Sequence, residues 1–427
     1  MDTRPNTRRV NRERKPTPSQ PPRGAKQIVI PMTRTQYDEV WHDTELLRAF
    51  VAEWVRSASE LFPAGFDRGY RLHGFGRESR KLPGLKLRKI VLADGASYWL
   101  RPSFVAGYMA GTVDELAYPL LLAAHGVPPW LLKIGFGHGE MYWHRLVERL
   151  GQSSLVGTTV RDPARLPVHL AADEHHADWS GRKGYLATTV GGGCLLGMAL
   201  TAAADDAHLR EAYAVFAAEA RDVEPEYAPE TVNADGWAAT RNAFRSLFPT
   251  ITVVLCFLHG FLRVRDRCRK ARDLHRRVWD VYRAASAEEF RRLMGGFQQW
   301  CATQTWPAPA REMLEKLWAK TESYAAAYDH PGCHRTSNAV DRPMNRLCRL
   351  MYAGRGLHGH QGSSELRLRG WALLQNFRPY APRGKRARAF DSPAHRINGK
   401  RYHEHWLHNL MASTSLMGFR NPKPAIR

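Results

Sequence analysis

The hydrophobic pattern of the chain changes its period near residue 167. After this point VHLAADEHHADW has the pattern of a strand that ends in acidic residues, and GYLATTVGG and CLLGMALTA have the pattern of two more strands. LREAYAVFAAEARDV has apolar residues at helical spacing. It is followed by a strand (ETVNADGW), a helix (WAATRNAFRSLF) and another strand (TITVVLCFLHG). This order predicts an α/β fold whose mixed sheet begins with three antiparallel strands.

A different pattern precedes this region, over residues 31–160. Two apolar runs flank Asp94-Gly95, which predicts a hairpin. Thr112 and Glu115 form a capping box that starts a helix, and a short helix and the helix GEMYWHRLVERL follow. This order favours a mostly helical N-terminal DNA-binding module of helix-turn-helix type, with an ordinary three-helix packing unit as the alternative.

The remaining segments are set apart by composition. Residues 1–30 are rich in Arg, Pro, Ser and Thr and are expected to form a disordered basic arm. Residues 263–332 are helical and Arg-rich, too long for a loop, and predict an all-α insertion. The insertion would separate a first part of the core, 161–262, from a last part, 333–381. Residues 382–427 are expected to form a basic C-terminal tail.

The charge balance narrows the class of partner. The 427 residues include 63 Lys and Arg against 41 Asp and Glu, a formal net charge of +22. Because Arg is spread along the whole chain, this excess favours nucleic acid over a membrane surface. The uncharged stretch 185–204 contains three consecutive glycines and predicts two strands and a bend, so no membrane span is expected. The N-terminus has no apolar signal region, which favours the cytoplasm.

Two acids follow apolar runs at strand ends in the core. Asp173 follows Val168, Leu170 and Ala172, and Asp235 follows Val232. A lone Asp at such a place is often a turn residue or helix cap. Two of them on neighbouring strands could converge on one divalent ion, as metal-dependent phosphodiester chemistry requires. Asp341, in the first turn of a later helix, is a candidate third ligand; capping of that helix is the alternative.

Together these residues resemble the catalytic domain of the DDE/D transposases, most closely the Mutator-like enzymes of bacterial insertion sequences. The resemblance rests on LAADEHHADW, TVNADGWAATRNAFRSLFP, CFLH and RTSNAVDR, and covers roughly residues 165–380. It implies a ribonuclease H-like core whose catalytic, metal-binding acids are Asp173, Asp235 and Asp341. Cys256 and His259 match the family's C-x-x-H, which we place on the strand after the second acid.

The resemblance also implies the chemistry. Two Mg²⁺ ions, for which Mn²⁺ would substitute, would support cleavage at transposon ends and strand transfer into target DNA. The protein would act as a homodimer or higher oligomer on DNA, in a prokaryotic cytoplasm at the nucleoid. Nuclease activity without joining and a silent, domesticated DNA-binding protein are the alternatives. Five arginines are candidate DNA contacts, although a solvated basic face explains the later three equally well: Arg145, Arg149, Arg335, Arg342 and Arg346.

Several positions stay open. The third acid of the family is usually Glu, so Glu365 is an alternative to Asp341. Glu174 and Asp178 compete with Asp173, although alternation along a strand would turn Glu174 to the opposite face. Two further hypotheses are weaker. Zinc could bind Cys256 and His259 together with His330, Cys333 and His334, and Trp300 and Trp306 could stack on an unpaired base.

Overall fold

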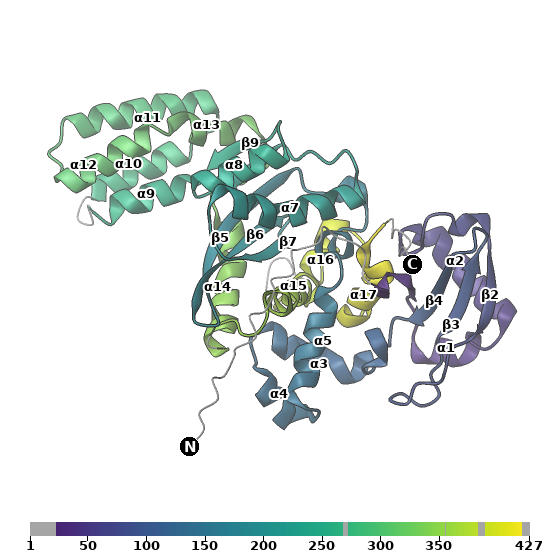
Figure 1. The fold of residues 1–427 in the computed structure, drawn as a ribbon. Helices are drawn as coiled ribbons and strands as arrows, with labels where there is room; N and C mark the ends of the chain where they lie inside the picture. Colours follow the sequence, from purple (N-terminus) through teal and green to yellow (C-terminus); the bar gives the residue numbers. More distant parts are fainter. Residues whose placement is uncertain (1–22, 268–271, 355, 383–388, 421–427) are drawn as a thin grey trace, which may run out of the picture.

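The computed structural model describes residues 23–267, 272–354, 356–382 and 389–420. It is a mixed α/β protein with two sheets. Figure 1 shows the larger sheet in the middle of the molecule, a helical bundle projecting on one side and the smaller sheet on the other. The described residues contain no helix long and apolar enough to cross a membrane.

The N-terminal part holds a four-stranded sheet in the order β1-β4-β3-β2, next to two helices. Its elements are β1 (Gln27–Ile30), α1 (Arg34–Val40), α2 (Thr44–Ser57), β2 (Tyr70–Phe75), β3 (Arg88–Leu92) and β4 (Ser97–Pro102). The hairpin predicted at Asp94-Gly95 is confirmed as the β3–β4 turn, where Gly95 has φ +82°. The module is therefore less helical than expected, because the apolar strands found here pack into a sheet core of their own.

The arm expected to be disordered through residue 30 is ordered at its end. β1 pairs in parallel with β4, and Ile28, Val29 and Ile30 are fully buried. The apolar run QIVI explains this difference, because burying it is favourable only where it can pair with a sheet edge. Residues 1–22 lie outside the described residues.

A three-helix segment follows and packs on the core. It comprises α3 (Val113–Ala124), α4 (Pro129–Phe136) and α5 (Glu140–Gly151), and the short α6 (Leu155–Thr159) comes next. The predicted capping box of Thr112 and Glu115 is present at the start of α3. Leu116, Leu120, Trp143 and Leu146 join the same hydrophobic cluster as the large sheet, so these helices share a core with it.

The large sheet has the order β7-β6-β5-β8-β9. Its strands and connecting helices are β5 (His169–Trp179), β6 (Arg182–Gly191), β7 (Cys194–Thr201), α7 (Asp206–Val223), β8 (Thr231–Ala234), α8 (Ala238–Leu247) and β9 (Thr252–Leu255). The predicted element order is confirmed. β5, β6 and β7 pair antiparallel, and β8 and β9 continue the sheet in parallel.

Two layers of helices cover this sheet. Leu170 and Ala172 of β5 face α7 and α8, whereas Ala171 and Ala177 face the layer of α14 (Asn338–Ala353) and α15 (Gln361–Phe377). Figure 1 shows these two layers on opposite sides. The strand alternation thus decides which β5 side chains point toward α14.

The described residues of the predicted insertion form helices joined by short loops, with no strand. The insertion comprises α9 (Phe257–Arg265), α10 (Arg272–Tyr282), α11 (Ala287–Ala302), α12 (Ala308–Trp318) and α13 (Thr321–Asp329), packed around their own hydrophobic cluster.

The expected tail is folded in part. α16 (Pro393–Asn398) and α17 (Trp406–Ser413) pack against α15, and Leu416 enters the core of the N-terminal sheet. The Ser415 hydroxyl accepts a hydrogen bond from the Val29 amide at 2.9 Å. The apolar residues of HWLHNLMASTSLMG explain this, because they cover surface of both the core and the small sheet.

Candidate active site

The parallel register of the large sheet aligns three of the predicted residues. Ala171 pairs with Asn233, and Ala234 pairs with Leu255. Continued along the chain, this register places Asp173 opposite Asp235, and Asp235 opposite Cys256. Adjacent strands lie about 4.8 Å apart, so the backbones of the two acids are close neighbours at the point where β8 ends.

The prediction that Asp173 lies at the end of its strand is wrong. Asp173 lies in the middle of β5. β5 continues to Trp179 because it pairs with β6 along its whole length. The shorter β8 ends at Ala234 and leaves that edge of β5 open beside Asp173. The end of the neighbouring strand, rather than the end of β5, therefore exposes this acid.

The alternation prediction for Asp173 and Glu174 is confirmed. His175, on the same side of β5 as Asp173, has its Nε2 3.5 Å from the Cys348 sulfur of α14. Glu174 points to the other face and accepts hydrogen bonds from Tyr213 and, at 2.7 Å, from Thr240. Asp178 accepts a hydrogen bond from the Gly181 amide in the β5–β6 turn. Of the three acids, Asp173 is the one on the α14 side near Asp235.

Asp341 comes from the first turn of α14. Ser337 occupies the N-cap position, but its side chain caps no backbone amide. Its hydroxyl instead donates to Asp341 Oδ2 at 2.9 Å. Asn338, the other candidate cap, is the first residue of the helix.

The three acids influence one another electrostatically. The pKa of Asp173 is raised to about 7 by burial and by the negative charges of Glu174, Asp235 and Asp341. A carboxylate is difficult to ionise where water is displaced and other carboxylates are near. Asp235, in addition, accepts a hydrogen bond from the Trp237 amide at 2.8 Å.

The C-x-x-H residues were predicted to lie on a strand, but they lie just after β9, at the start of α9. Cys256 follows β9 at the N-cap position of α9, and His259 lies in the first turn of that helix. β9 ends at Leu255 because the chain turns into α9 there, so neither residue is on the strand. The pair is nevertheless adjacent to the acids. A hydrogen bond with Cys256 raises the pKa of His259 to about 9 against the effect of burial, and the charges of Asp341 and Asp235 act in the same direction.

Cys256 also connects the sheet to α14. The Ser337 amide donates to its sulfur at 3.2 Å, and its thiol donates to the Ser337 hydroxyl at 3.5 Å. Burial acts to raise the pKa of Cys256, but hydrogen bonds with His259 and Ser337 outweigh burial and lower it. Cys256, Ser337 and Asp341 thus form a continuous hydrogen-bonded chain.

The site suits a metal ion in its donor chemistry but not in the positions of its side chains. The donor chemistry is suitable, because Mg²⁺ prefers carboxylate oxygens and a bound cation would relieve the repulsion that raises the pKa of Asp173. The side-chain positions do not form a ligand set: across the described ranges, no three His, Cys, Asp or Glu residues are arranged to hold an ion.

Glu365 lies elsewhere, on α15. Burial raises its pKa, while Arg369 and the Leu200 backbone act to lower it; none of the three aspartates has a part in this shift.

The weaker hypotheses find little geometric basis. The Cys333 thiol donates to the Ala327 carbonyl at 3.0 Å, and His330 lies 3.6 Å from Glu230, so these two side chains have separate partners. Trp300 and Trp306 pack against the insertion's own core, with ring centroids 5.9 Å apart.

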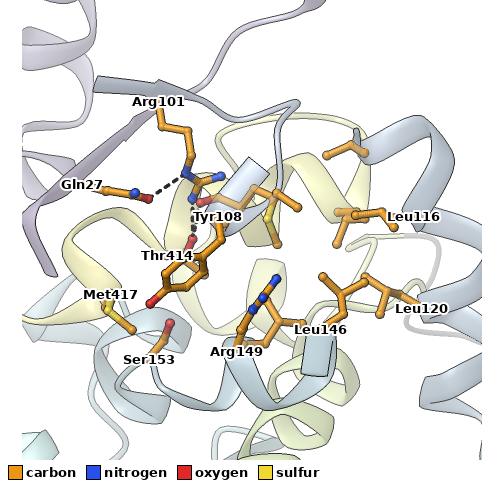
Figure 2. A pocket seen from close by; sticks show the side chains of 16 residues that line it. Gln27, Arg101, Tyr108, Leu116, Leu120, Leu146, Arg149, Ser153, Thr414 and Met417 are labelled. Carbon is orange, nitrogen blue, oxygen red and sulfur yellow. Dashed lines mark hydrogen bonds between the residues drawn. The ribbon is translucent and has the colours of Figure 1, made fainter. Parts of the chain in front are cut away.

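The five candidate DNA-binding arginines separate into two groups. Arg335, Arg342 and Arg346 line one large groove beside α14. Arg145 is exposed on α5, whereas Arg149 lines a small cavity of about 60 Å³ between α3, α5 and α17. Figure 2 shows Arg149 in this cavity near Tyr108, and its guanidinium lies 5.0 Å from the centroid of that ring. Arg149 therefore has a packing role in this structure.

Sequence reasoning missed a basic residue beside the acids. Burial and the charges of Arg263 and Arg241 lower the pKa of Lys320, and the nearby Asp235 acts to raise it. Lys320 comes from the insertion, at the boundary of α12 and α13. No local signal identifies it, because only the packing of the insertion brings it to the sheet.

The sequence matches no protein-family model and no curated protein.

Proposed function

We propose that the chain is a DDE/D transposase with a ribonuclease H-like core, which cleaves DNA at transposon ends and joins the freed 3′ ends to target DNA. The single observation that carries this proposal is the β5–β8 register, which brings Asp173 next to Asp235 when it is continued two residues past its last pair, with Asp341 close enough to affect the pKa of Asp173. The sheet order β7-β6-β5-β8-β9, with three antiparallel strands followed by two parallel ones, supports the fold assignment.

The chain's own residues have distinct roles in this proposal. Asp173, Asp235 and Asp341 would supply carboxylate oxygens to Mg²⁺, or to Mn²⁺ in its place, after their side chains move from the positions seen here, which do not form a ligand set. When bound, these ions would activate the attacking oxygen and stabilise the leaving oxygen. The hydrogen bond from Ser337 orients Asp341, and Cys256 positions Ser337. His259, with its raised pKa, places positive charge beside Asp235 and Asp341 at neutral pH.

The proposal is tested with Asp173→Asn and Asp235→Asn, each of which removes an anionic ligand and keeps the side-chain volume. Each variant should lose Mg²⁺-dependent nicking of a plasmid that carries the element's ends and should keep DNA binding. Asp178→Asn, on the same strand but at the β5–β6 turn, is the matched control and should cleave normally. Cleavage at the wild-type rate by either site variant would move the active site elsewhere.

The products separate the alternatives. Joined products on a supercoiled target identify a transposase, whereas nicks without joining identify a ribonuclease H-like nuclease. DNA binding with no cleavage by the wild-type protein in Mg²⁺ or Mn²⁺ would identify a silent DNA-binding protein. Whether it acts as a dimer or a larger oligomer on DNA is measured by light scattering of the complex.

A further inference from the structure

A large groove lies between α14 and the C-terminal end of α15, with the β6–β7 turn in its wall. Its volume is about 910 Å³. The wall is built from segments far apart in the sequence: residues 190–195 of the sheet, Tyr282 at the end of α10, 333–346 around the start of α14, 375–381 at the end of α15, and 393 and 396 of α16.

The groove is strongly basic. Five arginines line it, and none of its described lining residues is Asp or Glu: the arginines are Arg335, Arg342, Arg346, Arg378 and Arg396. None of the five forms an ion pair with a described residue. Burial and the positive charges of Arg378 and Arg342 lower the pKa of Arg346 to about 10, and its buried Nε has no hydrogen-bond partner in the described protein.

Neutral groups hold several of these cations in place. Arg378 donates to Gln375 Oε1 at 2.9 Å, and the Arg335 guanidinium lies 4.2 Å from the centroid of the Tyr328 ring. Arg396 donates to the Gly192 carbonyl and crosses the β6–β7 turn. Gly193 has φ +82°, a conformation that favours glycine, and the Arg396 guanidinium occupies the space beside its Cα. The positive charges are therefore preorganised without being neutralised.

The distribution of charge indicates the occupant. The arginines come from three separate segments, so positive charge reaches the groove from α14, from the end of α15 and from α16. An anion with repeated charges fits such a wall better than a single phosphate does. Tyr282 and Tyr380 add aromatic rings, and arginines interspersed with aromatic rings are typical of grooves that bind single-stranded nucleic acid.

We infer that this groove binds the phosphodiester backbone of a single DNA strand and guides it along α14 toward Asp341. The inference rests on the proposed function for the identity of the nucleic acid. α14 connects the groove to the candidate active site. Arg342 and Arg346 line the groove, and the adjacent Asp341 is one of the three acids Asp173, Asp235 and Asp341, called here the acid cluster.

The test is a binding assay in EDTA, in which cleavage has no part. The full chain is titrated into a fluorescent oligothymidylate of about 12 nucleotides, within the range of known single-strand sites, and the anisotropy is followed as a function of salt. The groove variant is Arg342→Gln with Arg346→Gln. The matched control, Arg276→Gln with Arg292→Gln, removes the same charge from exposed positions of the insertion.

The groove variant should bind roughly tenfold or more weakly near 0.1 M salt. Its logarithmic salt dependence should fall by about 1.4, since each single-strand phosphate contact contributes about 0.7. The control should stay within about twofold of wild type. Arg342→Glu alone is a second variant, at an exposed position, and should also weaken binding.

Equal affinity and salt dependence for the groove variants and the control would overturn the inference. Duplex DNA that competes better than the oligonucleotide, with the same loss in the groove variant, would overturn the single-strand assignment. The proposed function can fail without the groove inference. If the wild type never cleaves in Mg²⁺ but the groove variant still loses oligonucleotide binding, only the transposase proposal is contradicted.

Discussion

Asp173→Asn should change how the stability of the protein depends on pH. The substitution keeps the shape of the side chain but removes its charge. In the folded protein the pKa of Asp173 is about 7, against an ordinary value near 3.8, because of burial and three neighbouring acids. The folded state therefore binds this proton more tightly than the unfolded chain does between about pH 4 and pH 7.

The sign follows from this difference. Stability is lost as the pH rises through that window, and the loss is complete above pH 7. A tenfold change in proton affinity is about 1.4 kcal/mol, so the shift corresponds to about 4 kcal/mol at most. Asp173 is partly accessible to solvent, so screening lowers the expected cost to about 2–4 kcal/mol. Asp173→Asn avoids this cost and should be the more stable protein above pH 7.

Urea unfolding in EDTA from pH 5 to pH 9 measures the effect. The difference between variant and wild type should increase with pH and level off above pH 7. Asp178→Asn controls for the removal of one exposed carboxylate from the same strand. Saturating Mg²⁺ should raise the stability of the wild type more than that of Asp173→Asn, because a cation would balance the same repulsion. If the free energy of unfolding depended on pH in the same way for Asp173→Asn and the wild type, the electrostatic coupling of Asp173 to the neighbouring acids would be refuted.

The other predictions concern the network around the site and the core beneath it. Asp341→Ala should abolish plasmid cleavage, and Asp341→Glu should lose much of the cleavage rate because it moves the carboxylate by about 1.5 Å. Glu365→Ala should cleave normally. An active Asp341→Ala together with an inactive Glu365→Ala would make Glu365 on α15 the third ligand. Cys256→Ala should lower the cleavage rate without weakening DNA binding, because Ser337 and hence Asp341 lose their support; an unchanged rate would remove Cys256 from the network. Glu219→Ala should cost about 3–5 kcal/mol in urea unfolding, because it leaves its buried arginine partner on α15 uncompensated. Asp38→Ala breaks an exposed pair and should cost no more than about 0.5 kcal/mol; equal losses in these two variants would contradict the burial argument.

Much of the fold followed from local patterns. The order of strands and helices from β5 to β9 could be predicted, because the periods of strands and helices are properties of a few consecutive residues. The same alternation indicated that Asp173 and Glu174 face opposite sides of β5, and the hydrogen bonds of Glu174 to Tyr213 and Thr240 agree with it. Turn and capping signals at Asp94-Gly95 and Thr112 were equally local.

Element boundaries were predicted less well where a neighbouring strand or helix determines them. β5 continues past Asp173 because β6 pairs with it, and Cys256 leaves the sheet because α9 begins there. The ends of the chain were misjudged for a related reason. Composition indicated a basic tail, but Leu416 is buried in the core of the N-terminal sheet.

The sequence by itself determined the types and order of the core elements, the face of β5 that carries Asp173, and the excess of positive charge. Only the tertiary structure decided that the β5–β8 register brings Asp173 next to Asp235, that Ser337 links Cys256 to Asp341, and that five arginines from three segments line one groove. The physical reason is the range of the interactions. Periodicity, caps and turns depend on neighbours within a few residues, whereas strand register, helix packing and burial depend on contacts between segments whose separation along the chain carries no local signal.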